Sequence, residues 1–164
     1  MNKKVANIIA TYFGFGLSKF APGTAGSLGS LPLAYLLIYL GGWKALVITA
    51  VVIFFVGVKA TDFVIKDTGN EDPSKVVIDE TVGQLLTFSI LSQMAPDYLL
   101  GMKSIIYYIA GFALFRFFDI MKMGPVKYAD TKIKNAYGVM LDDVFAGIFA
   151  SVFLLALHLL LINL

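Results

Sequence analysis

Two pairs of adjacent acidic residues, each at the start of an apolar stretch, are the strongest chemical feature of this sequence. Asp79-Glu80 is followed by Val82-Gly83, and Asp142-Asp143 is followed by an uncharged run from Val144. The helix dipole favours acids in a first helical turn, so ordinary capping explains either pair alone. Two such pairs at the edges of apolar helices are costly without a cation. Oxygen ligands in a chain without cysteine favour Mg²⁺ over Zn²⁺, so the two pairs together indicate a shared Mg²⁺ site.

A second group, Arg116, Asp119 and Lys122, has a spacing of three residues, which places neighbours on one face of a helix. One interpretation is a ladder of ion pairs at a membrane surface, with the basic side chains extending toward water. The other is a phosphate site, in which the two cations hold phosphate oxygens and Asp119 contacts a metal or Arg116. The spacing alone leaves both open.

A third group is rich in glycine and hydroxyl residues. It comprises Gly14–Ser18, Pro22-Gly23-Thr24 and Gly26-Ser27, all ahead of or within the start of an apolar stretch. Free N–H groups at a helix N-terminus suit a phosphate. The alternative is a tight loop with Thr24 or Ser27 as the N-cap. Gly-Lys-Ser/Thr does not follow, which excludes a Walker loop.

The composition predicts the kind of scaffold that positions these groups. Hydrophobic residues make up 59% of the 164 positions and charged residues 15%, and the mean hydropathy is +0.82. A water-soluble domain needs more polar surface than this, so the sequence predicts one membrane-embedded domain over residues 1–164. The net charge of +2 is too small to indicate nucleic-acid binding.

The expected fold is an all-α, polytopic membrane protein with about five membrane-embedded helices and a short interfacial helix at Val5–Phe13. A very apolar soluble bundle is the alternative, because runs of about 14 residues are ambiguous. The last stretch argues against that alternative, because 21 residues without a formal charge are long enough to span a bilayer. The five stretches are Ser27–Gly42, Lys44–Thr61, Val82–Leu100, Ser104–Ile120 and Val144–Leu164.

The charges are sorted between the two sides that these helices define. With a cytoplasmic N-terminus, the inside segments together with Arg116 contain ten of the 13 basic residues, while Lys44 and Lys103 fall in outside turns. This bias agrees with the positive-inside rule, which says little about acids. Only Asp97 among the 11 acids falls outside, so the clustering of the others needs a different cause, such as a site at the cytoplasmic headgroup level.

In this order and spacing, the motifs resemble the phosphatidylglycerophosphatase A family of bacterial membrane enzymes. Two departures lie between the last two helices: Lys122-Met123-Gly124-Pro125 stands where the family usually has Lys-Pro-x-Pro, and Asn135-Ala136 where it has Gly-Gly. The matching strings are Gly14–Ser18, Pro22-Gly23-Thr24, Gly26-Ser27, Asp79-Glu80, Val82-Gly83, Phe115-Arg116, Asp119, Lys122, Gly138-Val139-Met140, Asp142-Asp143 and Ala146-Gly147.

The resemblance implies a Mg²⁺-dependent hydrolase of the bacterial inner membrane that converts phosphatidylglycerophosphate to phosphatidylglycerol and phosphate, with its site facing the cytoplasm. On this view Mg²⁺ binding and water activation fall to Asp79, Glu80, Asp142 and Asp143, with Asp119 as a further ligand. Arg116 and Lys122 neutralise the phosphate, and Thr24 and Ser27 cradle it.

Several alternatives stay open at this point. A phosphorylated Asp79 or Asp143 is the alternative to a water nucleophile. A cation channel or transporter and a membrane scaffold are the alternatives to an enzyme. A channel would place acids along the membrane normal, whereas these acids crowd one face. A scaffold leaves the Arg116, Asp119 and Lys122 group without a role.

Overall fold

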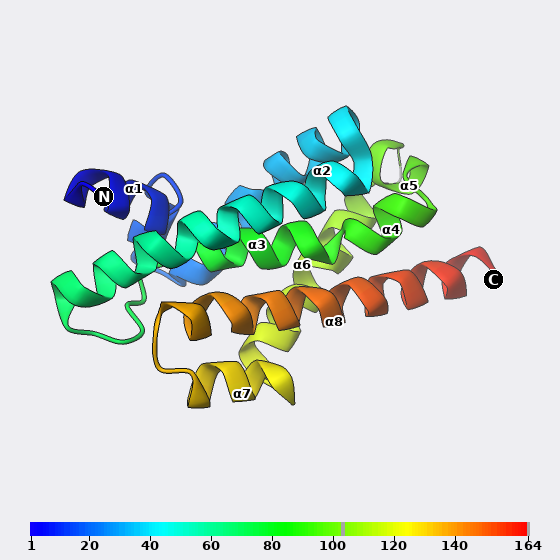
Figure 1. The fold of residues 1–164 in the computed structure, drawn as a ribbon. Coiled ribbons are helices and arrows are strands. Elements are labelled where there is room, and N and C mark those ends of the chain that lie inside the picture. Colours follow the sequence, from blue (N-terminus) through cyan, green and yellow to red (C-terminus); the bar gives the residue numbers. More distant parts are fainter. Residues whose placement is uncertain (103, 164) are drawn as a thin grey trace.

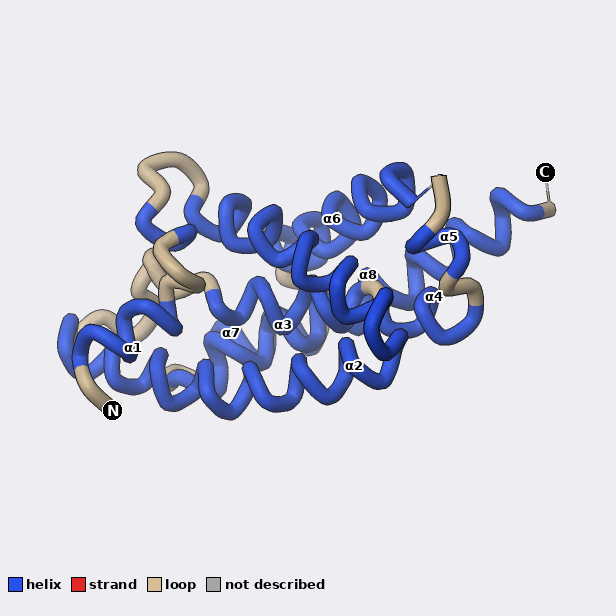
Figure 2. Tube along the Cα trace, turned by 90° about the horizontal axis from the view of Figure 1, so that it is seen from above, coloured by secondary structure: helices blue, strands red, loops and turns tan. Residues whose placement is uncertain are grey.

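The computed structural model describes residues 1–102 and 104–163, and every regular element in these ranges is helical (Figure 1). Lys103, expected in an outside turn, and Leu164, the expected end of the last stretch, lie outside these ranges. The two termini lie at opposite ends of the bundle in both views (Figure 2). The elements are α1 (Lys3–Ala10), η1 (Phe15–Leu17), α2 (Pro22–Thr68), α3 (Ile78–Thr87), α4 (Ser89–Met94), α5 (Asp97–Leu100), α6 (Ser104–Met121), α7 (Pro125–Lys132) and α8 (Ala136–Ile162).

Three helices, α2, α6 and α8, are long and apolar enough to cross a membrane. Their outward faces carry large apolar side chains, including Phe55 on α2, Ile109 on α6 and Phe153 on α8, each more than half exposed. Charged side chains are buried instead, at one end of the bundle. This arrangement is the inverse of a soluble bundle and confirms the prediction of an all-helical membrane protein.

Helix α2 is a hairpin of two arms that meet at Gly42. This residue has a φ of 61° and a ψ of −150°, a conformation that glycine adopts without steric cost. The arms on either side run in opposite directions (Figure 1), as expected from the Gly41-Gly42 pair. At 1.5 Å per residue each arm is about 30 Å or longer, enough for the hydrocarbon core.

The stretch Val82–Leu100, expected as one membrane helix, is divided among α3, α4 and α5. The side chains of Thr87 and Ser89 donate to carbonyl oxygens of the preceding turn, and such bonds compete with a regular helix at the break between α3 and α4. A second break falls before Pro96, whose ring disfavours helical backbone in Ala95. The chain still passes from one end of the bundle to the other through these pieces (Figure 1), but the count of five membrane helices is not confirmed.

Helix α3 lies at the centre of the bundle, with nine of its ten residues buried. It contacts both α2 and α8 extensively, and α6 packs on α8. The first turn of α3 carries Asp79 and Glu80. Because α3 is enclosed by the long helices, these acids are held inside the protein at the end of the bundle where α1 and α7 also lie (Figure 1).

Candidate active site

Five carboxyl groups from three helices meet at this end of the bundle, and all are nearly buried. They are Asp79 and Glu80 of α3, Asp119 of α6, and Asp142 and Asp143 of α8, each with at most 9% of its surface exposed. Two cationic side chains, Arg116 and Lys122, lie among them. The acids therefore exceed the bases by three in a confined space, which is unfavourable unless protons or a further cation neutralise them.

Helices α3 and α8 bring the two acidic pairs together through a close approach at Gly83 and Gly147. A Cβ atom on Gly147 would collide with the backbone oxygen and Cα of Gly83. A Cβ atom on Gly83 would collide with the ring of Phe115 and press on the backbone oxygen of Asp143. Small residues allow membrane helices to approach closely, so these glycines permit the acidic turn of α3 to lie against Asp143.

Arg116 links two of the carboxylates. Its Nη1 atom donates to Glu80 Oε2 at 2.5 Å and lies 2.7 Å from Asp119 Oδ2. Ser27, in the first arm of α2, donates its hydroxyl to the same Glu80 oxygen at 2.7 Å. Arg116 Nε is buried and has no acceptor among the residues described. A buried donor without a partner is uncommon and fits a site that receives an anionic ligand.

Lys122 joins α7 to α8. Its Nζ atom donates to Asp130 Oδ1 and Asp142 Oδ2, both at 2.7 Å. The backbone of Lys122 is left-handed, with a φ of 44°, an unusual conformation for a residue with a Cβ. Asp142 is therefore ion-paired with Lys122, and Asp130 is a neighbour of the site that was not predicted from the sequence. No periodic signal marks Asp130, because a turn at Gly124-Pro125 separates it from Lys122.

A cavity of about 220 Å³ opens among these groups. Asp72 and Ser74, from the loop before α3, also line it, although neither was predicted from the sequence as a site residue. Of the predicted phosphate-cradling pair, Thr24 is half-buried in the first turn of α2 and Ser27 is buried against Glu80, and neither is among the described residues that line the cavity. The lining consists of Gly23, Asp72, Ser74, Val76, Asp79, Glu80, Arg116, Asp119, Lys122, Val139, Asp142 and Asp143.

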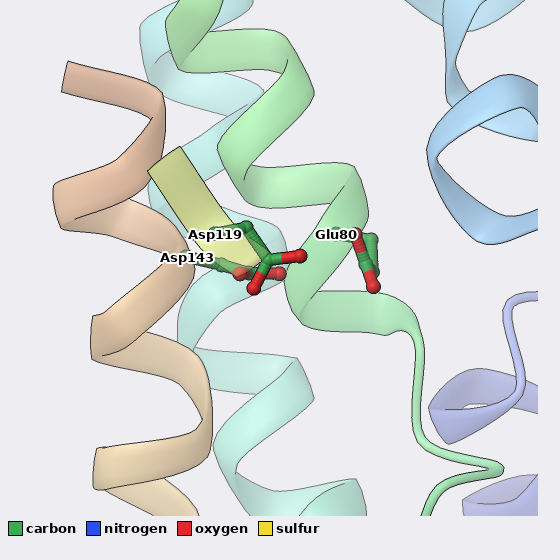
Figure 3. A group of neighbouring side chains, drawn as sticks. All are labelled: Glu80, Asp119 and Asp143. Atoms are coloured by element: carbon green, nitrogen blue, oxygen red, sulfur yellow. The ribbon is translucent and has the colours of Figure 1, made fainter. Parts of the chain in front are cut away.

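Three of the five predicted metal ligands are grouped closely enough to share one ion. Carboxylate oxygens of Glu80, Asp119 and Asp143 all lie within 4.8 Å of one another. Figure 3 shows Asp119 and Asp143 next to each other and Glu80 across from them. Opposite ligands of a Mg²⁺ ion lie about 4.2 Å apart at bond lengths of about 2.1 Å, so small side-chain movements would close this group on one ion. All three donors are hard oxygen atoms, the type that Mg²⁺ prefers.

The remaining two predicted ligands lie beside this group with other partners. Asp79 Oδ1 accepts the backbone N–H of Glu80 at 2.9 Å, and Asp142 Oδ1 accepts that of Asp143 at 3.0 Å. The two acidic pairs thus have the same local geometry on their separate helices. His158 is buried at the other end of α8, where its ring lies 3.0 Å from the Tyr107 hydroxyl.

The electrostatics of the α3 turn follow from burial and crowding. Burial, followed by the charges of Glu80 and Asp142, raises the pKa of Asp79 well above its usual range. Burial also raises the pKa of Glu80 to about 7, although Arg116 opposes the shift. For Lys122 the effect of burial is outweighed by the carboxylates of Asp142 and Asp130, and its pKa is raised. A divalent cation among the acids would favour their ionised forms.

The two departures from the family pattern form ordered structure. Gly124 has a φ of 55°, and Pro125 occupies the first turn of α7, where its fixed φ is favourable. Asn135 is the N-cap of α8, and its side chain accepts the backbone N–H groups of Tyr137 and Gly138. The segment between α6 and α8 is therefore fixed by a short helix and a polar cap.

Replacing Gly23 by alanine is expected to reduce activity without unfolding the protein. A Cβ atom at this position would collide with Glu80 Oε1 and press on Arg116 Nη1. The Glu80–Arg116 pair would have to shift, and we expect turnover to fall about tenfold or more, as for other misplaced catalytic groups. Gly29→Ala is the matched control on the same helix, because its Cβ would meet the half-exposed ring of Phe15, which can rotate away. Equal activities of the two variants would contradict this role for Gly23.

Together the fold and the site define a helical membrane protein with a buried cluster of carboxylates, one arginine and one lysine at one end of the bundle. The family model described as "Phosphatidylglycerophosphatase A" matches residues 8–158. The chain belongs to this family, whose bacterial members below are named for a lipid phosphatase.

Named relatives cover most of the chain. "Phosphatidylglycerophosphatase A" of Haemophilus influenzae is 36% identical over 93% of this chain and 88% of its own length. The Escherichia coli protein of the same name is 30% identical over 88% of this chain and 78% of its own length. A Bacteroides thetaiotaomicron protein named "Putative phosphatidylinositol-3-phosphatase" is 40% identical over 87% of each chain. No solved structure matches the chain significantly.

Proposed function

We propose that this protein hydrolyses the terminal phosphate of phosphatidylglycerophosphate, giving phosphatidylglycerol and inorganic phosphate, with Mg²⁺ as its cofactor. The observation that carries the proposal is the cluster of five buried carboxylates beside Arg116 and Lys122, in a chain of the phosphatidylglycerophosphatase A family. Phosphoryl transfer depends mainly on positioning and charge neutralisation, and this cluster supplies groups for both.

Mg²⁺ would be held by Glu80, Asp119 and Asp143, with Asp79 and Asp142 adjoining. When bound, such an ion neutralises phosphate oxygens and lowers the pKa of water. Arg116 lies beside two of these carboxylates, where its guanidinium can bind phosphate oxygens. Asp79 lines the cavity and would accept a proton from an attacking water, which would make a bond to phosphorus as the bond to the glycerol oxygen breaks. The leaving glycerol oxygen would then take up the proton that Asp79 had accepted, which returns Asp79 to its carboxylate form.

The lipid would remain in the bilayer during the reaction. The cavity lies where the apolar faces of α6 and α8 end, so the headgroup can enter it while the acyl chains stay beside the helices. We place this end of the bundle at the cytoplasmic face of the inner membrane, because ten of the 13 basic residues belong to the segments on that side.

Phosphate release from purified protein in vesicles containing phosphatidylglycerophosphate tests the activity directly. We expect phosphate release with Mg²⁺, loss of nearly all release after chelation with EDTA, and recovery when excess Mg²⁺ is added. A circular dichroism spectrum before and after chelation controls for unfolding. Full activity in EDTA would contradict the Mg²⁺ assignment and leave the hydrolase assignment intact.

The same assay decides between this proposal and its alternatives. Phosphatidylinositol 3-phosphate is included as a second substrate, because one relative is named for that lipid. Preferential release from it would move the proposal to a different headgroup. No phosphate release from either lipid would favour a channel, transporter or scaffold over an enzyme.

A further inference from the structure

The first 20 residues expose an unusual number of large apolar side chains. Phe13 is 78% exposed, Leu17 68% and Phe20 85%, and all three precede the first membrane helix. Val5 and Ile8 extend this apolar surface along α1, each about half exposed. Residues 1–20 form the N-terminal segment. So many exposed apolar side chains in one short segment indicate a surface that contacts another protein or a membrane.

The polar residues of the N-terminal segment are all neutral or basic. It contains Lys3, Lys4 and Lys19, and the first acidic residue of the chain is Asp62. Lys4 and Lys19 are exposed. Apolar side chains with flanking lysines are typical of a segment that lies in the interface of an anionic bilayer.

The opposite face of the N-terminal segment is packed on the bundle. Ala6 and Ala10 of α1 are fully buried, α1 packs on α2, and Lys3 forms a 2.7 Å ion pair with Asp67 at the end of α2. The segment is therefore fixed at the site end of the bundle, where it continues directly into α2 (Figure 1).

The N-terminal segment also holds the residues just before the acidic turn of α3. The backbone N–H of Val77 donates to Ala10 O at 2.8 Å. Gly16 lies so close to the loop before α3 that a Cβ would collide with the carbonyl oxygen of Lys75. Val77 also packs against Gly26 of α2. Because Asp79 follows two residues later, the position of the N-terminal segment sets the position of the acidic turn.

We propose that the N-terminal segment is a docking surface for an anionic lipid bilayer, and that its insertion holds the acidic turn of α3 at the depth of the lipid phosphates. A bilayer fits this surface better than a protein partner does. The apolar side chains continue without a break into the membrane helix α2, and every charged side chain of the segment is a lysine. The dependence of activity on this contact rests on the proposed function, whereas the docking itself does not.

Fluorescence measurements test the docking without any assay of activity. Because the chain has no cysteine, the single variants Phe13→Cys, Leu17→Cys and Phe20→Cys can each carry an environment-sensitive NBD label in vesicles of phosphatidylethanolamine and phosphatidylglycerol. The variants Asn70→Cys and Thr131→Cys, at exposed polar positions of the same end, are labelled in the same way and serve as controls. We expect spin-labelled lipid to quench the first three labels and aqueous iodide to quench the two controls. Quenching of the first three labels by iodide would overturn the proposal, because these positions would then face water. Quenching by neither reagent would also overturn it, because protein would then cover these positions.

Activity measurements test the dependence. The triple variant Phe13→Ser, Leu17→Ser, Phe20→Ser is expected to lose about tenfold or more of its turnover on substrate in bilayers. Its turnover on a short-chain, water-soluble substrate should match the wild type. The control variant Leu40→Ser, Ile105→Ser, Leu160→Ser removes the same number of exposed apolar side chains elsewhere and should retain both activities. Equal losses on both substrates would overturn the coupling, while absence of activity in the wild type would count against the proposed function alone.

Discussion

Asp143→Asn is expected to abolish phosphate release while leaving the protein folded in the membrane. Asp143 is 3% exposed and lies within 4.8 Å of Glu80 and Asp119 through its carboxylate oxygens. Asparagine has nearly the same shape, but it removes a negative charge and replaces one oxygen by an N–H donor. A site that depends on a divalent cation should lose at least about a hundredfold in turnover from this change.

The matched control is Asp97→Asn, the same substitution at the only acid predicted on the opposite side. Asp97 is exposed at the start of α5, and no ion pair involves it among the residues described. We expect this variant to keep wild-type turnover. Asp79→Asn should lose activity as Asp143→Asn does, because Asp79 lies in the same cavity wall. Retained turnover in both site variants, with normal membrane insertion, would sink the assignment of the acidic cluster as the active site.

The acidic pairs could be predicted from sequence because their chemistry is local. Asp79-Glu80 and Asp142-Asp143 each stand at the entry to an apolar stretch, where a charge must be explained. The ion-pair partner of each acid could not be predicted. Glu80 reaches Arg116, whereas Asp142 reaches Lys122, and both partners are far away in the chain. The spacing of residues in the sequence does not predict such contacts, because they depend on how α3, α6 and α8 are rotated relative to one another.

The fold was predictable where one strong signal dominated a segment. Gly41-Gly42 fixed the bend of α2, and the uncharged run after Val144 fixed most of α8. The prediction of a continuous helix over Val82–Leu100 was wrong, because it rested on the apolar composition of the stretch and not on the individual residues that interrupt a helix. Pro96 and the hydroxyl of Thr87 each favour a break, and the freed N–H of Ile90 is within hydrogen-bonding distance of Ser151 on α8, at 3.3 Å. A tertiary contact of that kind leaves no trace in the sequence of either helix.

Two substitutions of Arg116 should distinguish the effect of its positive charge from the effect of its planar guanidinium geometry. Arg116→Leu leaves Glu80 and Asp119 without their shared cation, although both are nearly buried. Removing one member of a buried ion pair typically costs about 3–5 kcal/mol of stability. Arg116→Lys keeps the charge but loses the planar fork that binds two oxygens at once. We therefore expect Arg116→Lys to fold with near wild-type stability and both variants to lose at least about a hundredfold in turnover.

Thermal unfolding in detergent, with and without Mg²⁺, distinguishes the structural cost from the catalytic one. If Glu80, Asp119 and Asp143 hold the ion, Mg²⁺ should raise the Tm of Arg116→Leu more than that of the wild type. Among the residues described, Arg116 is the cation that contacts both Glu80 and Asp119. In Arg116→Leu the bound ion would therefore replace the positive charge that these two acids have lost. Activity should not return with stability, because the ion cannot replace a guanidinium that binds phosphate oxygens. Recovery of turnover together with Tm would show that Arg116 acts through the acidic cluster and not on the substrate.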